Sequence, residues 1–366
     1  MIHYLNLCND PFQCIKLGKK SVEMRLNDER RKNITDGDIL VFENNSTGEK
    51  MAVEVVCKKV YKDFFELYKH YDKSEIGYET DEVADPNDML KYYSQDKIDQ
   101  YDALAIHIKP LKKHVIVFDM DDTMLKNNKT ISEYSLNILK TLQDLGHKIV
   151  INTARSKYYN SEYFNLIKPN YAILNGGALI IDKVEKILYK SVFKKENIRD
   201  IIAEFLKYTK VFSIQTENDF LTNNESYKGQ NAKYYDFSKE YFDDEGYKIV
   251  ASFEKLEDAF KVGAKFNLAV VPYFDGKFVR FNNLGISKYS GNEKLSQIIG
   301  IPLDDFIVFG DDIGDIEMIE KSGEGVLMSN SNVFEKYPNI IKTEFSNDED
   351  GVCKYLDKKF KISAKP

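Results

Sequence analysis

The pattern of apolar and polar positions divides the chain into two regimes. In residues 1–110, turn-forming clusters separate short apolar runs, and the runs 39–42 and 51–56 flank a polar loop that contains a glycine. Two such runs joined by a polar loop predict a β-hairpin. The acidic, tyrosine-rich segment 62–102 predicts partial helix, and the run 103–108 predicts a closing strand. We therefore expect a small β-barrel-like domain with helical insertions.

After a linker at 109–113, buried strands alternate with amphipathic helices. Val115–Phe118 is an unbroken apolar run, which is typical of a strand buried on both faces. Apolar residues recur at helical spacing from Ile131 to Leu145, and Gly146 is a stop signal. The other predicted elements are strands at 148–151, 171–174, 306–309 and 325–328 and a helix at 313–322. This alternation indicates an α/β fold with a Rossmann-like parallel sheet and helices on both faces.

A stretch from about residue 180 to 272 interrupts the alternation. It combines strand-like runs at 187–189 and 211–214 with amphipathic helices near 195–208 and 254–265. This stretch is long enough to form an α+β subdomain inserted between two halves of the sheet.

Composition limits the classes of function. A chain of 366 residues predicts two or three domains. The net charge of −7 gives no electrostatic reason for nucleic acid or an acidic membrane to bind the protein as a whole. The four cysteines have no zinc-binding spacing, and neither a signal peptide nor an apolar run of about 18 residues is evident. We expect a cytoplasmic protein with no membrane span.

Acidic residues follow two of the predicted buried strands. Asp119 and Asp121 follow the first strand, and Asp311, Asp312 and Asp315 follow the late strand at 306–309. Ligands of open parallel sheets bind outside the carboxyl ends of the strands, so these side chains are expected to converge there. Clustered carboxylates repel one another and imply a cation, and hard oxygen ligands suit Mg²⁺. The alternative is that single residues such as Asp311 or Asp312 only cap the helix that begins near Ile313.

Several ordered motifs resemble the haloacid dehalogenase superfamily, and within it the Cof-type phosphatases that carry a type IIB cap. The motifs are D-x-D-x-T at 119–123, Thr153, Asn175–Ala178, Gly285–Lys288, GDxxxD at 310–315 and Asp348–Val352. The resemblance implies a hydrolase core formed by 113–178 and 273–366, with the cap at 179–272. Gly314 departs from the pattern, because many relatives carry Asn at that position.

The resemblance also implies a catalytic role for four residues. Asp119 would be the nucleophile that takes the phosphoryl group as an aspartyl-phosphate. Asp121 would protonate the leaving oxygen and then deprotonate the attacking water. Thr153 would hydrogen-bond a phosphate oxygen, and Lys288 would neutralise charge on the phosphate and the nucleophile. The expected substrates are small phosphorylated metabolites such as sugar phosphates, nucleotides or cofactor phosphates.

The metal set that the resemblance implies overlaps with these residues. Mg²⁺ would be bound by the Asp119 carboxylate, the Asp121 carbonyl and Asp311, while Asp315 would hold the waters of the metal or Lys288. Asp312 is either a further ligand or a plain helix cap. The role of Arg155 is also open, between substrate contact and a surface position.

The N-terminal segment contains Gly18–Arg25, which matches G-x-K-x-x-E-x-R. This motif resembles the ASCH domains, small barrels related to the PUA fold that are suspected of binding RNA. Lys20, Glu23 and Arg25 are therefore candidate residues for binding RNA or a nucleotide, and the alternative is an exposed ion-pair network. Some ASCH relatives hydrolyse acetylated cytidine with a Lys and a Thr, but Glu23 stands at the matching Thr position, which disfavours that activity.

Three functions are compatible with this organisation. The first is a Mg²⁺-dependent phosphatase, and the second is an RNA- or nucleotide-binding protein whose phosphatase half is secondary. The third is a bifunctional enzyme of nucleoside metabolism. Residues 1–110 hold 16 basic and 21 acidic residues, a net charge of −5, which opposes broad affinity for nucleic acid. The residues of the phosphatase motifs favour the first function.

Overall fold

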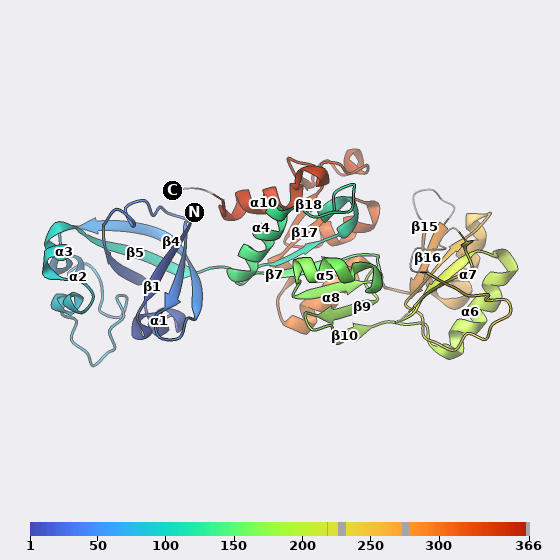
Figure 1. The fold of residues 1–366 in the computed structure, drawn as a ribbon, viewed down its shortest axis with the longest axis horizontal. Coiled ribbons are helices and arrows are strands. Elements are labelled where there is room, and N and C mark those ends of the chain that lie inside the picture. The colour runs from blue at the N-terminus through green and yellow to red at the C-terminus, as the bar shows by residue number, and fades with distance from the viewer. Residues whose placement is uncertain (218, 226–231, 273–277, 364–366) are drawn as a thin grey trace. The chain divides into compact units, whose positions relative to one another are not determined.

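The structure, a computed structural model, describes residues 1–217, 219–225, 232–272 and 278–363, except for the side chains of residues 158 and 334 (Figure 1). The chain divides into two compact units. One comprises Met1–Lys113, Thr141–Gly146 and Leu356–Pro366, and the other comprises His114–Lys140 and His147–Tyr355. None of the described helices is long and apolar enough to cross a membrane.

The first unit is built on a five-stranded sheet with the order β1-β3-β4-β5-β2. Its strands are β1 (Ile2–Leu7), β2 (Val22–Leu26), β3 (Ile39–Asn44), β4 (Lys50–Tyr61) and β5 (Ala103–Pro110). The predicted hairpin is confirmed, since β3 and β4 pair antiparallel. The predicted closing strand is β5, which pairs with β4 and β2. Its helices are α1 (Asn9–Lys16), α2 (Phe64–Tyr68), η1 (Pro86–Lys91) and α3 (Gln95–Gln100).

A side chain connects the two end strands of this sheet. The Arg25 guanidinium on β2 donates a hydrogen bond of 2.7 Å to the Asn6 carbonyl on β1. The sheet therefore curves so that β1 and β2 approach each other. Figure 1 shows these strands in blue tones.

The second unit contains an eight-stranded sheet with the order β10-β9-β8-β7-β6-β17-β18-β19. Its strands are β6 (Val115–Phe118), β7 (Lys148–Asn152), β8 (Tyr171–Leu174), β9 (Leu179–Asp182), β10 (Ile187–Lys190), β17 (Phe306–Gly310), β18 (Glu324–Leu327) and β19 (Ile341–Lys342). Six neighbouring strands of this sheet run parallel, namely β8, β7, β6, β17, β18 and β19. β9 is antiparallel to β8, and β10 is antiparallel to β9. The predicted parallel α/β sheet is thus present, with β6 at its centre.

Helices and short turns connect these strands. They are η2 (Met120–Met124), α4 (Glu133–Asp144), η3 (Tyr158–Asn160), α5 (Ser161–Ile167), α8 (Lys288–Ile299), η5 (Leu303–Asp305), η6 (Ile313–Asp315), α9 (Ile316–Glu320), η7 (Phe334–Lys336), η8 (Asn347–Glu349) and α10 (Gly351–Phe360). The helix expected at 313–322 is a 3-10 turn followed by a short α-helix, because Asp312 and Asp315 form a capping box around the turn.

A six-stranded sheet with the order β13-β12-β11-β14-β16-β15 forms the rest of this unit. Its elements are α6 (Lys195–Tyr208), β11 (Phe212–Gln215), β12 (Phe220–Thr222), β13 (Lys233–Tyr234), β14 (Lys248–Ser252), α7 (Leu256–Phe266), β15 (Leu268–Pro272) and β16 (Phe278–Asn283). We call this part the cap. Phe205 on α6 and Val262 on α7 pack with Phe212, Ile249 and Phe281 of the sheet, so both helices cover one face. Figure 1 shows α6 and α7 beside this sheet.

The strand pairing differs from the expected cap segment 179–272 at both ends. β9 and β10 continue the core sheet to Lys190, and β16 belongs to the cap sheet. The difference arises because the sequence of a short strand does not indicate which sheet the strand joins. The core and the cap are therefore connected between β10 and α6 and again between β16 and α8.

Candidate active site

The acidic loops that follow β6 and β17 lie next to each other because these two strands are parallel neighbours in the sheet. Phe118 pairs with Phe309 at the ends of these strands, and the Asp119 amide donates to the Phe309 carbonyl at 3.1 Å. Asp119 and Asp311 therefore leave the sheet at the same edge, as parallel strand ends require. The order of the strands thus brings these two carboxylates together, as we expected from the sequence.

A buried lysine joins the carboxylates. Lys288 begins α8, where Ser287 and Ser290 form a capping box that fixes the start of the helix. The Lys288 Nζ atom lies 3.0 Å from Asp119 Oδ1 and 2.5 Å from Asp315 Oδ1. Burial alone would lower the pKa of Lys288, but the two carboxylates outweigh burial and raise it. Lys288 is therefore held as a cation inside the site.

Asp315 organises the loop that follows β17. Its carboxylate is fully buried, and Oδ2 accepts hydrogen bonds of 3.1 Å from the amides of Asp311 and Asp312. At Gly310, a Cβ atom would lie 2.4 Å from the Cβ of Asp315. The GDxxxD motif thus needs its glycine for close packing and its last Asp to hold the loop.

Three carboxylates form a compact acidic cluster. One oxygen from each of Asp119, Asp311 and Asp315 lies within 4.8 Å of the other two. Burial, which Lys288 only partly offsets, raises the pKa of Asp119 to about 6. Burial and the neighbouring Asp315 raise the pKa of Asp311 to about 8. Carboxylates that hold protons near neutral pH are not fully neutralised by the positive charge around them. A divalent cation would supply that charge, and Mg²⁺ prefers hard oxygen ligands such as these.

The raised pKa values predict how metal and pH affect stability. Between the ordinary value of 3.8 and about 8, the folded protein binds more protons at Asp311 than the unfolded chain does. The stability of the metal-free protein should therefore fall as pH rises through this window. Mg²⁺ replaces those protons, so we expect it to raise the unfolding temperature more at pH 8 than at pH 6. Thermal unfolding with Mg²⁺ or EDTA at both pH values measures this, and equal shifts would contradict it.

Asp121 lies apart from the cluster. Its carboxylate accepts from Arg155 Nε at 2.7 Å and from Lys129 Nζ at 2.8 Å. Burial would raise its pKa, but hydrogen bonds from Arg155 and Lys129 outweigh burial and hold the pKa below its ordinary value. Asp121 is therefore ionised in this arrangement, and it acquires a proton to donate only if substrate binding separates it from these cations. Sequence reasoning left Arg155 open and did not find Lys129, because neither contact follows from spacing along the chain.

The remaining predicted residues have clear positions. Thr153 is buried after β7, and its Oγ1 accepts from the Arg155 amide at 3.2 Å. Asp312 accepts from the Ile313 amide at 2.6 Å, which is a cap contact. Thr123, the last residue of the D-x-D-x-T motif, donates to Asp311 Oδ1 at 2.6 Å, a role that the sequence did not assign. A Cβ atom at Gly314 would meet nothing within 4 Å, so the glycine there is not required by packing.

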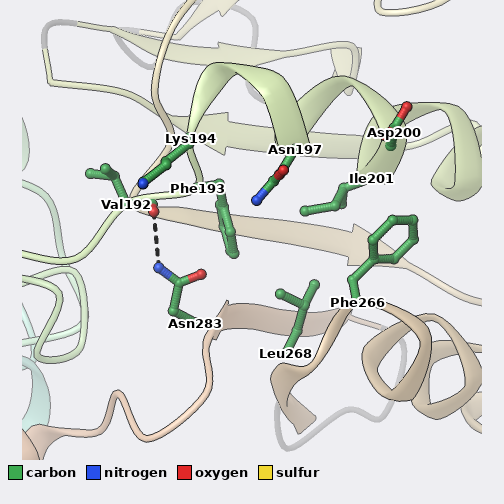
Figure 2. A pocket seen from close by; sticks show the side chains of 9 residues that line it. All are labelled: Val192, Phe193, Lys194, Asn197, Asp200, Ile201, Phe266, Leu268 and Asn283. Carbon is green, nitrogen blue, oxygen red and sulfur yellow. Dashed lines mark hydrogen bonds between the residues drawn. The ribbon is translucent and has the colours of Figure 1, made fainter.

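Two of the hollows in the second unit are lined by described residues. One, of about 340 Å³, adjoins Asp311 and is lined by Asp122, Asn127, Asp311, Asn330, Asn332, Ser346, Asn347 and Asp348. The other, of about 330 Å³, lies in the cap (Figure 2). Figure 2 shows that α6 residues and Phe266 surround it, while the Asn283 amide donates to the Val192 carbonyl at 2.9 Å. None of the residues lining the second hollow belongs to the acidic cluster.

The N-terminal motif also forms a charged group. Glu23 on β2 is buried, with Arg25 Nε at 2.7 Å and Lys20 Nζ at 3.2 Å from its carboxylate oxygens. Burial would raise the pKa of Glu23, but Lys20 and Arg25 outweigh burial and hold it below its ordinary value. The three residues therefore form a buried ion-pair group and not an exposed network.

Removing Glu23 should destabilise this unit. Glu23→Ala removes the carboxylate that neutralises Lys20 and Arg25, and breaking comparable buried pairs costs about 3–5 kcal/mol. We expect a lower unfolding temperature for the first unit, measured by thermal unfolding. Glu49→Ala breaks the exposed Lys16–Glu49 pair and is the control, with little change expected. Equal effects of the two substitutions would contradict the buried arrangement.

Two protein-family models match this chain, one in each half. The family model described as haloacid dehalogenase-like hydrolase matches residues 116–356. The ASCH domain model matches residues 5–112.

Relatives and solved structures resemble the second half. A 5-amino-6-(5-phospho-D-ribitylamino)uracil phosphatase of Bacillus subtilis is 25% identical over 276 residues, which cover 69% of this chain and 99% of that protein. A second B. subtilis phosphatase with the same named substrate is 25% identical over 246 residues, covering 66% of this chain and 94% of its own length. The crystal structure of a haloacid dehalogenase-like hydrolase from Bacteroides thetaiotaomicron superimposes with a TM-score of 0.59 at 22% identity, covering 68% of this chain and all of that one.

Proposed function

Because the chain belongs to the haloacid dehalogenase-like hydrolases and carries an N-terminal ASCH domain, we propose that it is a Mg²⁺-dependent phosphatase of small phosphorylated metabolites. The observation that supports this most is the contact of Lys288 with both Asp119 and Asp315. Asp311 completes the acidic cluster at the same edge of the sheet. A nucleophilic carboxylate beside a buried cation and a metal-binding cluster is an arrangement suited to phosphoryl transfer.

The reaction would proceed in two steps on this chain's own groups. In the first, an Asp119 carboxylate oxygen attacks phosphorus, the bond to the leaving oxygen breaks, and Asp121 gives that oxygen a proton. In the second, Asp121 takes a proton from water, whose oxygen attacks phosphorus. The bond to Asp119 then breaks and inorganic phosphate leaves. The proton that Asp121 takes from water in the second step replaces the one that it gave to the leaving oxygen in the first.

The neighbouring groups would hold the phosphoryl oxygens and the metal. Lys288 and the Thr153 hydroxyl would stabilise negative charge that spreads over those oxygens in the transition state. Mg²⁺, held by the carboxylates of Asp119 and Asp311 and the Asp121 carbonyl, would add positive charge at the same place. Asp315 would act by keeping Lys288 and the loop of Asp311 in position.

Phosphate release from a panel of phosphate esters, with Mg²⁺ and with EDTA, tests the proposal. The two relatives named as ribitylaminouracil phosphatases make that phosphate ester the first compound to include. Sugar phosphates, nucleotides and cofactor phosphates complete the panel. Metal-dependent release concentrated on a few related compounds supports the proposal, and no release from any ester overturns it.

A second candidate is RNA or nucleotide binding by the ASCH domain. The buried group formed by Lys20, Glu23 and Arg25 favours a specific small ligand there. The basic residues around it are mostly paired with acids, as in Lys16–Glu49, Lys19–Glu79 and Arg31–Asp28, and this pairing weighs against extended phosphate-backbone binding. Gel-shift assays with short RNA and thermal shifts with single nucleotides separate the two ligands. A shift by a nucleotide that Lys20→Ala removes would support this candidate.

A further inference from the structure

The cap sheet has one face that its helices do not cover. Ile214, Ile249 and Phe281 point toward α6 and α7, so alternate residues of the same strands point the other way. Six polar residues on that second face are buried. They are Ser213, Gln215, Thr222, Lys248, Arg280 and Asn282.

Two cations are neighbours on this second face of the cap sheet. Val250 pairs with Arg280, and Lys248 lies two residues from Val250 on the same side of β14, so Lys248 and Arg280 are diagonal neighbours across the two strands. Each side chain is only 9% exposed. Burial and the nearby Arg280 lower the pKa of Lys248 to about 7, as expected of like charges placed close together.

Neither cation has an anionic partner in the part of the chain that the structure describes. Lys248 Nζ donates to the Ala154 carbonyl at 2.5 Å, and Arg280 Nε has no hydrogen-bond partner. Within the described ranges, neither forms an ion pair with a carboxylate, whereas the other two buried lysines, Lys20 and Lys288, both do. A buried charge without a partner costs several kcal/mol, and two adjacent cations cost more. Such a pair is therefore expected to be completed by an anion.

The position of the pair points to the substrate. Ala154 lies between Thr153 and Arg155 in the loop after β7, and a Cβ atom at Gly176, just after β8, would lie 2.8 Å from an Arg280 guanidinium nitrogen. β6, β7 and β8 are parallel neighbours, so these loops leave the same sheet edge as Asp119. The amide of Gln215 already donates to Thr216 and Asp219, and that of Asn282 donates to Tyr247. Among the described side chains of this face, Lys248 and Arg280 are the charged donors that remain for a ligand.

We propose that Lys248 and Arg280 bind a second anionic group of the substrate, a carboxylate or a second phosphate carried by the leaving group. This inference rests on the proposed phosphatase function and narrows its substrate class to metabolites with an oxyanion besides the phosphate that is cleaved. The planar guanidinium and the point charge of Lys248 together suit such a group. Neither residue takes part in bond making or breaking.

Matched substrate pairs test the assignment. 6-Phosphogluconate carries a carboxylate where sorbitol 6-phosphate carries a hydroxymethyl group, and fructose 1,6-bisphosphate adds a phosphate to fructose 6-phosphate. For the full chain with Mg²⁺, we expect kcat/KM to be higher for the doubly anionic member of at least one pair by roughly 10- to 100-fold. The pair that shows the preference distinguishes a carboxylate from a phosphate. The ratio of kcat/KM for the doubly anionic member to that for its partner should fall toward one in Arg280→Met and in Lys248→Met. Arg280→Lys should keep part of this preference.

The control is Lys261→Met, which removes a cap cation that is exposed and paired with Asp258. It should leave the preference as in the wild type. Unfolding temperature is the second readout, because replacing an unpaired buried cation with Met should leave stability equal or higher. The inference is overturned, while the phosphatase function stands, if the wild type has nearly equal kcat/KM values for the two members of each pair. It is also overturned if the ratio of these values is unchanged in both Met variants. A marked loss of stability in Arg280→Met also overturns it by showing a structural role. Absence of phosphate release from every ester overturns the phosphatase function itself.

Discussion

Replacing Asp119 with Asn is expected to abolish Mg²⁺-dependent phosphate release while the protein remains folded. The amide has nearly the same shape as the carboxylate, but its oxygen is a poor nucleophile and a weaker metal ligand. Loss of a nucleophile that acts together with its partners lowers turnover by roughly 10³-fold or more. Stability should change little, because burial already raises the pKa of Asp119 to about 6 and disfavours its charge. Initial rates of phosphate release and thermal unfolding measure the two effects.

Asp122→Asn is the matched control for this experiment. Asp122 lies in the same loop, is exposed, and contacts neither Lys288 nor Asp315 among the described ion pairs. Its φ of 53° is a left-handed conformation that Asn tolerates well. We expect rates close to those of the wild type. Substantial metal-dependent turnover in Asp119→Asn would rule out Asp119 as the nucleophile.

Replacing Lys288 with Met is expected to lower both activity and stability. The substitution removes the cation that contacts Asp119 and Asp315 and leaves two buried carboxylates facing each other. Breaking a buried pair by removing one partner costs about 3–5 kcal/mol of unfolding free energy. Losing one preorganised positive group costs roughly 10²- to 10³-fold in turnover. Mg²⁺ should recover part of the lost stability, because it supplies positive charge to the same carboxylates.

Lys294→Met tests whether these effects are specific to the site. Lys294 lies on the same helix, α8, is half-buried, and contacts Gln297 and the Tyr189 ring instead of the acidic cluster. Its loss should leave the rate unchanged and lower the unfolding temperature much less than Lys288→Met does. Thermal unfolding with Mg²⁺ and with EDTA separates loss of the ion pairs from loss of the metal. If Lys288→Met matched Lys294→Met in stability, the buried position of the Lys288 ammonium group would be wrong.

The sequence determined the elements and the residues at the strand ends. Val115–Phe118 and Phe306–Gly310 are apolar without interruption, and only a strand covered on both faces keeps such a run out of water. The acids that follow these strands then have one possible meeting place, the shared edge of a parallel sheet. For the same reason the sequence alone groups Asp119, Asp311 and Asp315, and its periodicity alone predicts the helix at 195–208.

Tertiary structure decided which side chains are buried and which partners they meet, because neither follows from a motif or from spacing along the chain. The pairing of Asp121 with Arg155, the burial of Glu23 between Lys20 and Arg25, and the sheet that β9, β10 and β16 join all depend on how elements pack. The same holds for Lys248 and Arg280, which look like ordinary surface cations until β14 pairs with β16 and buries them. Local pattern specifies which face of an element is apolar, but the charge that a side chain will meet is set by the neighbour that packing brings to it.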